Sequence, residues 1–326
     1  HGTATGWVAG KELLQNNDLQ VWLPWDSVFA VQRFLKFFQP VLGLILETEL
    51  WPELIGQCHL QKIPLCLVNG RLSEKTLKRT QKWGGSLMQS TYQQLFLVLP
   101  QTTQDAQRYQ LLQANVGPVL GNLKFDAAIH EKQQALGHVW RSSFQLPVLM
   151  LASSREGEEA LFLQALLHHP LQNQLLNSFQ ILIVPRHPQR FNQVAQLIEQ
   201  TGLSLSRRSQ WPHSNPVPAT IVLGDSIGEM PIYYSASACV LMGGSFLPLG
   251  GQNLIEACLY GCPVIMGPSM FNFAQASLAA IESKAGQAVE SFDEGLAVAY
   301  AWLTENQLNS FQERATRFSA QHAGAS

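Results

Sequence analysis

Short apolar runs recur along the chain, separated by longer stretches in which apolar and polar residues are mixed at helical spacing. The runs contain three to six residues, mostly Val, Ile and Leu, and turn residues bound most of them. Strands of a parallel sheet are buried on both faces, so they appear in a sequence as continuous apolar runs. The pattern therefore predicts an α/β protein built on parallel sheets. The predicted strands are residues 21–23, 41–46, 64–68, 95–99, 148–151, 181–184, 221–223, 239–242 and 264–266.

The chain is predicted to form two domains. Its 326 residues correspond to about two domains of ordinary size. The division is expected near residues 137–145, after a polar helix at Glu131–Gln134 and before the apolar run that opens the second half. We place the boundary between residues 138 and 139, so that each domain has its own sheet. Ligands bind beyond the carboxyl ends of parallel strands, and the loops of the two domains are expected to face a central cleft.

Charge and composition exclude several classes of protein. Lys and Arg total 21, Asp and Glu total 23, and only 13% of residues are charged, so no basic surface for nucleic acid is expected. Hydrophobic residues reach 46%, which argues against disorder. No apolar run is long enough to predict a membrane span. The five cysteines show no metal-site spacing and are interpreted as small buried residues in a reducing cytoplasm.

Polar residues of the first domain follow its predicted strands. Glu47 and Glu49 come directly after an apolar run and before a proline that can begin a helix, so their carboxylates could contact substrate or cap the helix. Arg71 could bind an anion or pair with one of these carboxylates, and Ser73 is a candidate N-cap. Lys124 could neutralise a phosphate or be an ordinary surface lysine.

Polar residues of the second domain occupy the same kind of position. Ser153 or Ser154 is expected to cap a helix whose free N–H groups could also bind phosphate. Arg186 and His187 stand between two prolines that keep the backbone extended, which suits an anionic or heteroaromatic ligand. Gly228 would allow a ligand to approach the backbone closely.

The Gly-rich segment at residues 242–256 is the strongest candidate for a binding site. One glycine pair follows a predicted strand at residues 243–244 and another precedes a helix at residues 250–251, so their N–H groups are expected to be open to an anion. Asn253 and Glu256 share one face of the first helical turn. Phosphate could bind at the N–H groups while Glu256 accepts hydrogen bonds from sugar hydroxyls. The spacing matches neither a P-loop nor G-x-G-x-x-G.

Taken together, these motifs resemble the Kdo transferases, GT-B glycosyltransferases that move 3-deoxy-D-manno-octulosonic acid (Kdo) from its CMP-activated donor to a lipid A precursor. The resemblance covers nearly the whole chain and implies two Rossmann-like domains with parallel sheets. Residues 1–138 would form the acceptor-side domain and residues 139–326 the domain that binds the CMP-sugar. The segments that carry the resemblance are Glu47–Pro52, Asn69–Ser73, Gly121–Asp126, Pro185–Pro188, Gly228–Met230 and Gly243–Glu256.

The resemblance also implies roles for individual residues. Glu47 and Lys124 match the pair that stabilises the transition state. The donor CMP-Kdo is the substrate, and neither cofactor nor metal is implied, because cations and helix N–H groups can offset the charge on the leaving phosphate. The reaction would be an inverting transfer. The positions that match CMP-binding residues are Arg186, His187, Gly228, Glu229, Met230, Asn253, Leu254, Ile255 and Glu256.

Further properties of the family imply a location and partners. Its members act in lipopolysaccharide biosynthesis at the cytoplasmic face of the bacterial inner membrane, where the lipid A precursor lies. A hydrophobic N-terminal anchor and the Gly-Glu pair that supplies the general base have no counterpart in this chain, so the chain alone is expected to be inactive. Trp7, Trp22 and Trp25 could contact lipid or pack into the core.

Two other functions stay open. A UDP-sugar transferase or epimerase of the same two-domain architecture would share the Gly-rich helix start and Glu256. A non-catalytic remnant would be consistent with the missing general base. The sequence leaves open the number of Kdo units added, the acceptor variant and the oligomeric state.

Overall fold

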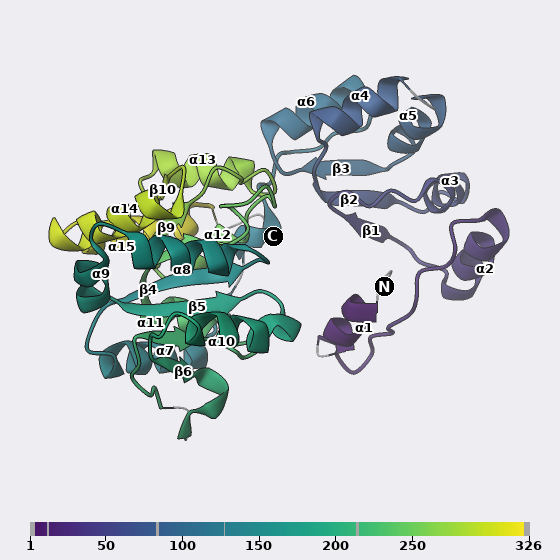
Figure 1. Cartoon of the computed structure of the whole chain (residues 1–326). Coiled ribbons are helices and arrows are strands. Elements are labelled where there is room, and N and C mark those ends of the chain that lie inside the picture. Colours follow the sequence, from purple (N-terminus) through teal and green to yellow (C-terminus); the bar gives the residue numbers. More distant parts are fainter. Residues whose placement is uncertain (1–3, 12, 83–84, 127, 213–214, 323–326) are drawn as a thin grey trace. The chain divides into compact units, whose positions relative to one another are not determined.

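The computed structural model describes the chain except residues 1–3, 12, 83–84, 127, 213–214 and 323–326 (Figure 1). Contacts divide it into two units, one up to Leu123 and one from Lys124 onward. The boundary predicted at residue 138 falls inside helix α7 (Glu131–Ser143), which packs against α11 (Met230–Ala236) of the second unit. A Cβ on Gly137 would lie 2.5 Å from the Ile232 carbonyl oxygen, so glycine permits this close packing. The structure therefore divides before α7 rather than within it.

The first unit is built on a parallel sheet in the order β1-β2-β3. Three of the predicted strands are confirmed, as β1 (Gly43–Leu46), β2 (Leu65–Gly70) and β3 (Leu97–Pro100). Buried side chains such as Val31, Ile55 and Leu67 form one core between the sheet and its helices. The helices of this unit are α1 (Ala4–Lys11), α2 (Val28–Phe38), α3 (Pro52–Leu60), α4 (Glu74–Lys82), α5 (Gly85–Gln93) and α6 (Thr103–Leu111).

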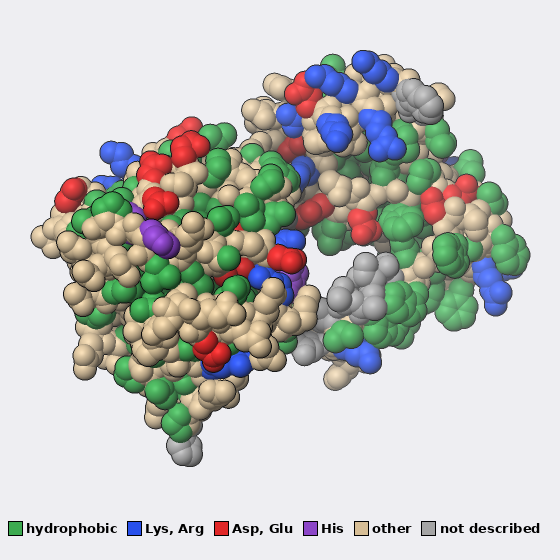
Figure 2. All heavy atoms as spheres, in the orientation of Figure 1, with side chains coloured by type: hydrophobic (Ala, Val, Ile, Leu, Met, Phe, Trp, Pro, Cys, Tyr) green, Lys and Arg blue, Asp and Glu red, His purple; other side chains and the backbone are tan. Residues whose placement is uncertain are grey.

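The strand predicted at residues 21–23 is wrong. This run pairs with no strand among the described residues, and Trp22 stacks on Trp7 with ring centroids 4.8 Å apart. Hydrophobic side chains also gather on the outer surface around α2 (Figure 2), where Trp25, Phe29 and Phe37 are 88%, 77% and 78% exposed. The apolar character of this region therefore reflects aromatic surface contacts rather than a buried strand.

The second unit is built on a seven-stranded parallel sheet in the order β10-β9-β8-β4-β5-β7-β6. Its strands are β4 (Val148–Ser154), β5 (Gln180–Pro185), β6 (Leu205–Arg207), β7 (Ile221–Leu223), β8 (Ser237–Met242), β9 (Val264–Met266) and β10 (Gly286–Ala288). Besides α7 and α11, its α-helices are α8 (Glu158–His168), α9 (Gln172–Ser178), α10 (Phe191–Glu199), α12 (Leu254–Leu259), α13 (Ala274–Glu282), α14 (Phe292–Thr304) and α15 (Leu308–His322).

Helices cover both faces of this sheet (Figure 1). Val148 and Met150 of β4 face a core that includes side chains of α7, α11, α12 and α15. Leu149 and Leu151, which alternate with them, face a second core formed with α8, α9, α10 and α14. The prediction of a parallel sheet buried on both faces is therefore confirmed.

The sequence pattern missed two strands of the second unit's sheet. β6 and β10 are three-residue edge strands with sequences LSR and GQA, which contain no apolar run.

All five cysteines are buried free thiols, as the sequence predicted. Burial raises the pKa of both Cys239 and Cys258 to about 12.

Candidate functional site

The candidate site of the second unit lies at the carboxyl end of its sheet. β4 lies between β5 and β8. After β4 the chain forms β5, β6 and β7 on one side of it, and then returns to form β8, β9 and β10 on the other side. The loops after β4 and β8 therefore diverge at a topological switch point, the usual ligand position in such sheets. The predicted binding residues follow β5, β7 and β8, and the parallel ladders bring these loops to one edge.

Arg186 and His187 occupy the loop after β5. The Arg186 N–H donates to the Ser154 carbonyl oxygen over 2.9 Å, which fixes the start of this loop against the end of β4. The Arg186 side chain is exposed, whereas His187 is half-buried. Desolvation first, and then the charges of Arg155, Arg186 and Arg190, lower the pKa of His187. The imidazole is therefore neutral at neutral pH and can act as a hydrogen-bond partner rather than a second cation.

Glu256, in the first turn of α12, is influenced by the charges of two basic groups. The Asn253 side-chain oxygen accepts a hydrogen bond from the Ile255 N–H at 3.2 Å and so caps the helix, as expected for this residue type. Burial raises the pKa of Glu256, and the charges of Arg186 and His130 oppose this rise. His130, for which the sequence pattern contains no signal, therefore belongs to the same cluster.

Two of the predicted binding residues face the interior. Leu254 and Ile255 are 0% and 1% exposed and pack into the core on the α12 side of the sheet. Their side chains cannot contact a ligand, so only their backbone groups are available for that purpose. The polar residues on either side of them, Asn253 and Glu256, are partly exposed.

The loop after β7 turns at Gly228, whose φ is +78°. The Gln133 side chain of α7 donates to the Gly228 carbonyl oxygen over 3.0 Å, and a Cβ on this glycine would meet nothing within 4 Å. The Glu229 carboxylate accepts from Arg208 at 2.8 Å and from the Ser226 hydroxyl. Gly228 thus leaves room for a ligand, whereas Glu229 already has two intramolecular partners.

The glycine pairs do not present open N–H groups, which corrects the sequence prediction. Gly244 donates to the Glu158 carboxylate at 2.6 Å, and Phe246 donates to the same carboxylate at 3.1 Å. In the second pair, Gly250 donates to the Ser269 hydroxyl and Gly251 to the Gly244 carbonyl oxygen. Glu158 is completely buried, so this loop is stabilised by an internal carboxylate rather than by a ligand.

The predicted cap of α8 is also wrong. The N-cap is Gly157, with φ +93° and no side-chain cap. Ser154 instead donates to the buried Glu159 carboxylate at 2.7 Å, and Arg190 binds that carboxylate through two hydrogen bonds of 2.7 and 2.9 Å. This arrangement connects the end of β4 to the turn Pro188–Arg190 that follows His187. It is a positioning contact for the Arg186 loop.

Asp225 has a structural role in the same region. It accepts hydrogen bonds from the Arg207 guanidinium at 2.8 Å and from both the N–H and the hydroxyl of Ser209. These bonds link the loop after β7 to the chain that follows β6. The sequence pattern gave no indication of Arg207 or Arg208, because the short strand β6 contains no signal that its end lies beside this loop.

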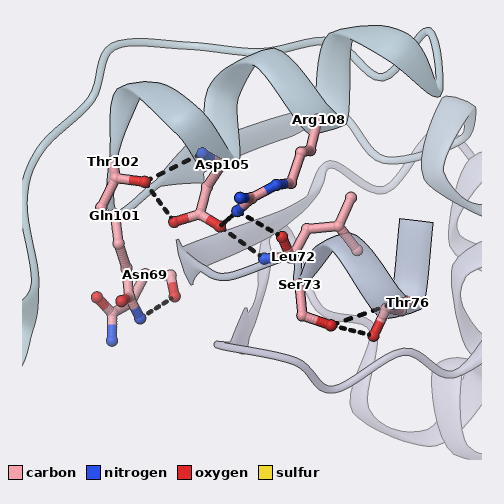
Figure 3. A network of polar contacts seen from close by, with 8 residues as sticks. All are labelled: Asn69, Leu72, Ser73, Thr76, Gln101, Thr102, Asp105 and Arg108. Atoms are coloured by element: carbon pink, nitrogen blue, oxygen red, sulfur yellow. Dashed lines mark hydrogen bonds and ion pairs between the residues drawn. The ribbon is translucent and has the colours of Figure 1, made fainter. Parts of the chain in front are cut away.

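The first unit contains a second polar network, around the loop after β2 (Figure 3). Asp105 of α6 is 3% exposed; it accepts from the Leu72 N–H at 2.9 Å and the Thr102 hydroxyl at 2.6 Å. Arg108 donates to the Leu72 carbonyl oxygen at 3.0 Å and lies 3.4 Å from Asp105. Ser73 accepts from the Thr76 N–H at 3.1 Å, which confirms its predicted role as an N-cap. The loop is therefore fixed on both sides.

The polar segments that begin at Glu47 and Asn69 meet Leu123, the last residue of this unit before Lys124, at the carboxyl end of its sheet. The Arg71 N–H donates to the Glu47 carbonyl oxygen at 3.3 Å, and the Leu123 N–H donates to the Asn69 side chain at 3.2 Å. Glu47 and Asn69 both have positive φ, 56° in each case. Lys124 follows in the turn Leu123–Asp126, and its side chain lies outside the described residues.

Two features are absent from the described part of the chain. No group of three or more His, Cys, Asp or Glu residues has a geometry that could hold a metal ion there. None of the helices in that part is both long and apolar enough to cross a membrane.

Comparison with known proteins identifies the family. Residues 1–127 match the family model described as 3-deoxy-D-manno-octulosonic-acid transferase (kdotransferase). The 3-deoxy-D-manno-octulosonic acid transferase of Bordetella pertussis is 40% identical over 100% of this chain and 77% of its own length. The chain belongs to the Kdo transferase family. The Kdo transferase of Haemophilus influenzae is 34% identical, and this chain covers 64% of its length.

Solved structures agree with this assignment. The C-terminal CMP-Kdo binding domain of WaaA from Acinetobacter baumannii is 28% identical, with a TM-score of 0.50, and the match covers 58% of this chain and 96% of that domain. A UDP-GlcNAc 2-epimerase from Neisseria meningitidis matches 99% of this chain with a TM-score of 0.63 at 16% identity. The second match shows that this Kdo transferase family member has the GT-B fold, as predicted.

Proposed function

We propose that the protein transfers Kdo from CMP-Kdo to a lipid A precursor, in an inverting reaction that needs no metal. Membership of the Kdo transferase family supports the transfer of Kdo in lipopolysaccharide biosynthesis. The Acinetobacter baumannii domain named for CMP-Kdo binding supports CMP-Kdo as the donor. Its match covers 58% of this chain, which is close to the fraction of the chain that the second unit contains. The candidate binding residues lie in that unit.

The cluster of Arg186, His130 and Glu256 carries the proposal of a CMP site. Loss of CMP from the donor builds negative charge on phosphate, and Arg186 would offset this charge because its exposed guanidinium can bind phosphate oxygens directly. Glu256 would accept hydrogen bonds from ribose hydroxyls. His187 is neutral and would donate or accept one bond, while Gly228 leaves the backbone before Glu229 and Met230 open to the nucleotide.

The N–H groups available to phosphate are those at the start of α12 rather than those of the glycine pairs. Among the described residues, no hydrogen bond has the N–H of Gln252 or Leu254 as its donor. Together with Asn253, these groups would assist Arg186 in stabilising the leaving phosphate. We therefore expect the phosphate to bind at the start of α12 rather than at the glycine pairs.

On the acceptor side, we propose that Glu47 and Lys124 stabilise the transition state. Glu47 is held at a positive φ between β1 and the β2 loop, which supports a position fixed by the backbone. The lipid A precursor and the cytoplasmic face of the inner membrane are the proposed partner and location. The exposed side chains of Trp25, Phe29 and Phe37 are consistent with contact with a lipid surface.

Calorimetric titration with CMP tests the donor site. The chain is expected to bind CMP, and Arg186→Ala should weaken binding by about 10- to 100-fold, because a hydrogen bond to a charged group is lost. Arg141→Ala is the matched control, since Arg141 is exposed about 12 Å along α7 from Gln133 and should bind like the wild type. Absence of CMP binding, or tighter binding of UDP, would contradict the proposal and favour a UDP-sugar enzyme.

A transfer assay on the full-length gene product tests the acceptor side. Incubation with CMP-Kdo and a lipid A precursor should yield a lipid that mass spectrometry finds heavier by Kdo. Glu47→Ala should lower the rate by about 100-fold or more, whereas Glu49→Ala, which loses only a 3.1 Å bond from Trp51, should retain most activity. Equal rates for the two variants would exclude Glu47 from the chemistry, and no turnover at all would favour a non-catalytic protein.

A further inference from the structure

A hollow lies at the opposite end of the second unit's sheet from the candidate CMP site. Its volume is about 520 Å³, within the range of ligand sites. The strands are parallel, and this hollow includes Gly286, the first residue of β10, together with Lys284 just before it. The CMP-site residues follow the carboxyl ends of the strands instead. The two sites are therefore distinct.

The hollow is lined by two cations and by no acidic residue. Lys284 stands before β10, and Arg314 comes from α15. Among the described residues neither side chain forms an ion pair, whereas Arg190, Arg207 and Arg208 of the same unit each bind a carboxylate. Neither charge is therefore neutralised by a carboxylate among the described residues, and both stay available to an anion.

Hydrogen-bond donors and one aromatic ring complete the lining. Ser310 contributes a hydroxyl group and Gln287 a side-chain amide. The Arg314 guanidinium carbon lies 5.3 Å from the centre of the Phe311 ring, which orients the guanidinium at the wall of the hollow. Phe311 itself stacks on the buried ring of Trp302, with centroids 4.1 Å apart, so this wall is rigid.

We propose that this hollow binds a phosphate monoester, with Lys284 and Arg314 as the residues that neutralise it. A phosphate monoester carries nearly two negative charges at neutral pH, which two cations match, and a guanidinium can bind two of its oxygens in parallel. Ser310 and Gln287 donate to the remaining oxygens. The Phe311 ring contacts the organic group of the ester.

Amide NMR spectra of the chain provide the test, because the signals of Gly286, Gln287 and Ser310 report this hollow and not the CMP site. Inorganic phosphate should shift these signals saturably, while chloride at equal ionic strength should not. Phenyl phosphate should bind more tightly than inorganic phosphate because of the Phe311 contact. No saturable shift with either phosphate, or the same shift with chloride, overturns binding of a soluble phosphate.

Variants assign the binding to the two cations. Lys284→Gln and Arg314→Gln should each weaken phosphate binding by about tenfold or more, because each loses at least one charged hydrogen bond. Arg314→Lys keeps the charge and should restore most of the affinity, which separates loss of charge from loss of packing on Phe311. Lys132→Gln removes an exposed lysine of α7 and should leave binding unchanged. Equal affinity for the wild type and both glutamine variants overturns the proposal.

Vesicle sedimentation identifies the source of the phosphate. Phosphatidylcholine vesicles with added phosphatidic acid present the monoester as a lipid headgroup. Sedimentation that Lys284→Gln and Arg314→Gln abolish, without a shift by free phosphate, assigns the site to a lipid headgroup. A shift by free phosphate with no such sedimentation assigns it to a soluble ester. If free phosphate causes no shift and the vesicles do not sediment the protein, the proposal is overturned completely.

Discussion

Each unit of the molecule holds a buried carboxylate that accepts hydrogen bonds from the backbone of a loop beside its sheet. Asp105 in the first unit forms an ion pair with Arg108 and accepts a hydrogen bond from the Thr102 hydroxyl. Among the described residues, the Leu72 N–H is the one loop N–H that donates to it. Glu158 in the second unit accepts from the N–H groups of Arg155, Gly244 and Phe246 and has no cationic partner among the described residues.

The difference shows two ways to stabilise a loop at the end of a parallel sheet. When Asp105 is removed, Arg108 still donates to the Leu72 carbonyl oxygen, and the Leu72 N–H is the one loop N–H that loses its acceptor. A carboxylate that serves only buried N–H groups leaves all of them without acceptors when it is removed. The loop after β8 should therefore depend more strongly on its acid than the loop after β2 does.

Glu158→Ala should give the largest effect. Three N–H groups lose their acceptor in the interior, so the free energy of unfolding should fall by about 4 kcal/mol. CMP affinity should fall too, since the Glu158 loop precedes Asn253. Urea unfolding and calorimetry measure both quantities, with the neighbouring exposed Glu156→Ala as the control. A loss no larger than that of Glu156→Ala would show that the loop does not need this carboxylate.

Asp105→Ala should have a smaller effect, about 2 to 3 kcal/mol in the free energy of unfolding, because it removes one buried acceptor and leaves Arg108 with the Leu72 carbonyl oxygen. CMP binding by the second unit should be unchanged. Hydrogen exchange at Leu72 should increase more than elsewhere. Gln104→Ala, on the exposed face of α6, is the control. An effect larger than that of Glu158→Ala would reverse the comparison.

The pH dependence of stability tests the buried environment of Glu158. Burial raises the pKa of Glu158 above its ordinary value. As pH rises past that ordinary value, the unfolded chain loses the proton while the folded chain keeps it, so the free energy of unfolding falls. The fall should amount to about 1.4 kcal/mol for each tenfold difference in proton affinity between the folded and unfolded chains, and it should end above the raised pKa. Urea unfolding across this range should show the slope in the wild type and in Glu156→Gln but not in Glu158→Gln. A free energy that rises through this window would contradict the raised pKa.

Removing the helix caps next to the two loops should change the free energy of unfolding least. Ser73→Ala and Asn253→Ala each remove one cap bond, and each should lower the free energy of unfolding by about 1 kcal/mol. Only Asn253→Ala should also weaken CMP binding. If both variants bind CMP like the wild type, the start of α12 is not part of the donor site.

The sequence predicted most strands of both sheets because buried parallel strands are continuous apolar runs. It failed where that signal is absent or misleading: β6 and β10 are short edge strands without an apolar run, and the aromatic residues around Trp22 form no strand. The strand ends also led to Arg186, Gly228 and Glu256. The charge of Arg186 acts on the pKa of Glu256, whereas a shared site that includes Gly228 stays a prediction.

The parts of the site that could not be predicted depend on contacts between distant residues. Nothing near Gly244 indicates that its N–H is occupied by Glu158, which lies far earlier in the chain. In the same way, His130 and Gln133 reach the site because α7 packs on α11, and this packing depends on Gly137. Local patterns identify loops, whereas the partners of those loops follow from tertiary packing.

The buried thiols give each unit its own chemical reporter of opening. Cys58 and Cys66 lie in the first unit, while Cys239, Cys258 and Cys262 lie in the second. A thiol that is shielded from solvent, with its pKa raised by burial, reacts with a maleimide only after the surrounding structure opens. Timed alkylation followed by peptide mass spectrometry would therefore record the unfolding rate of each unit separately in a single sample, without any introduced label.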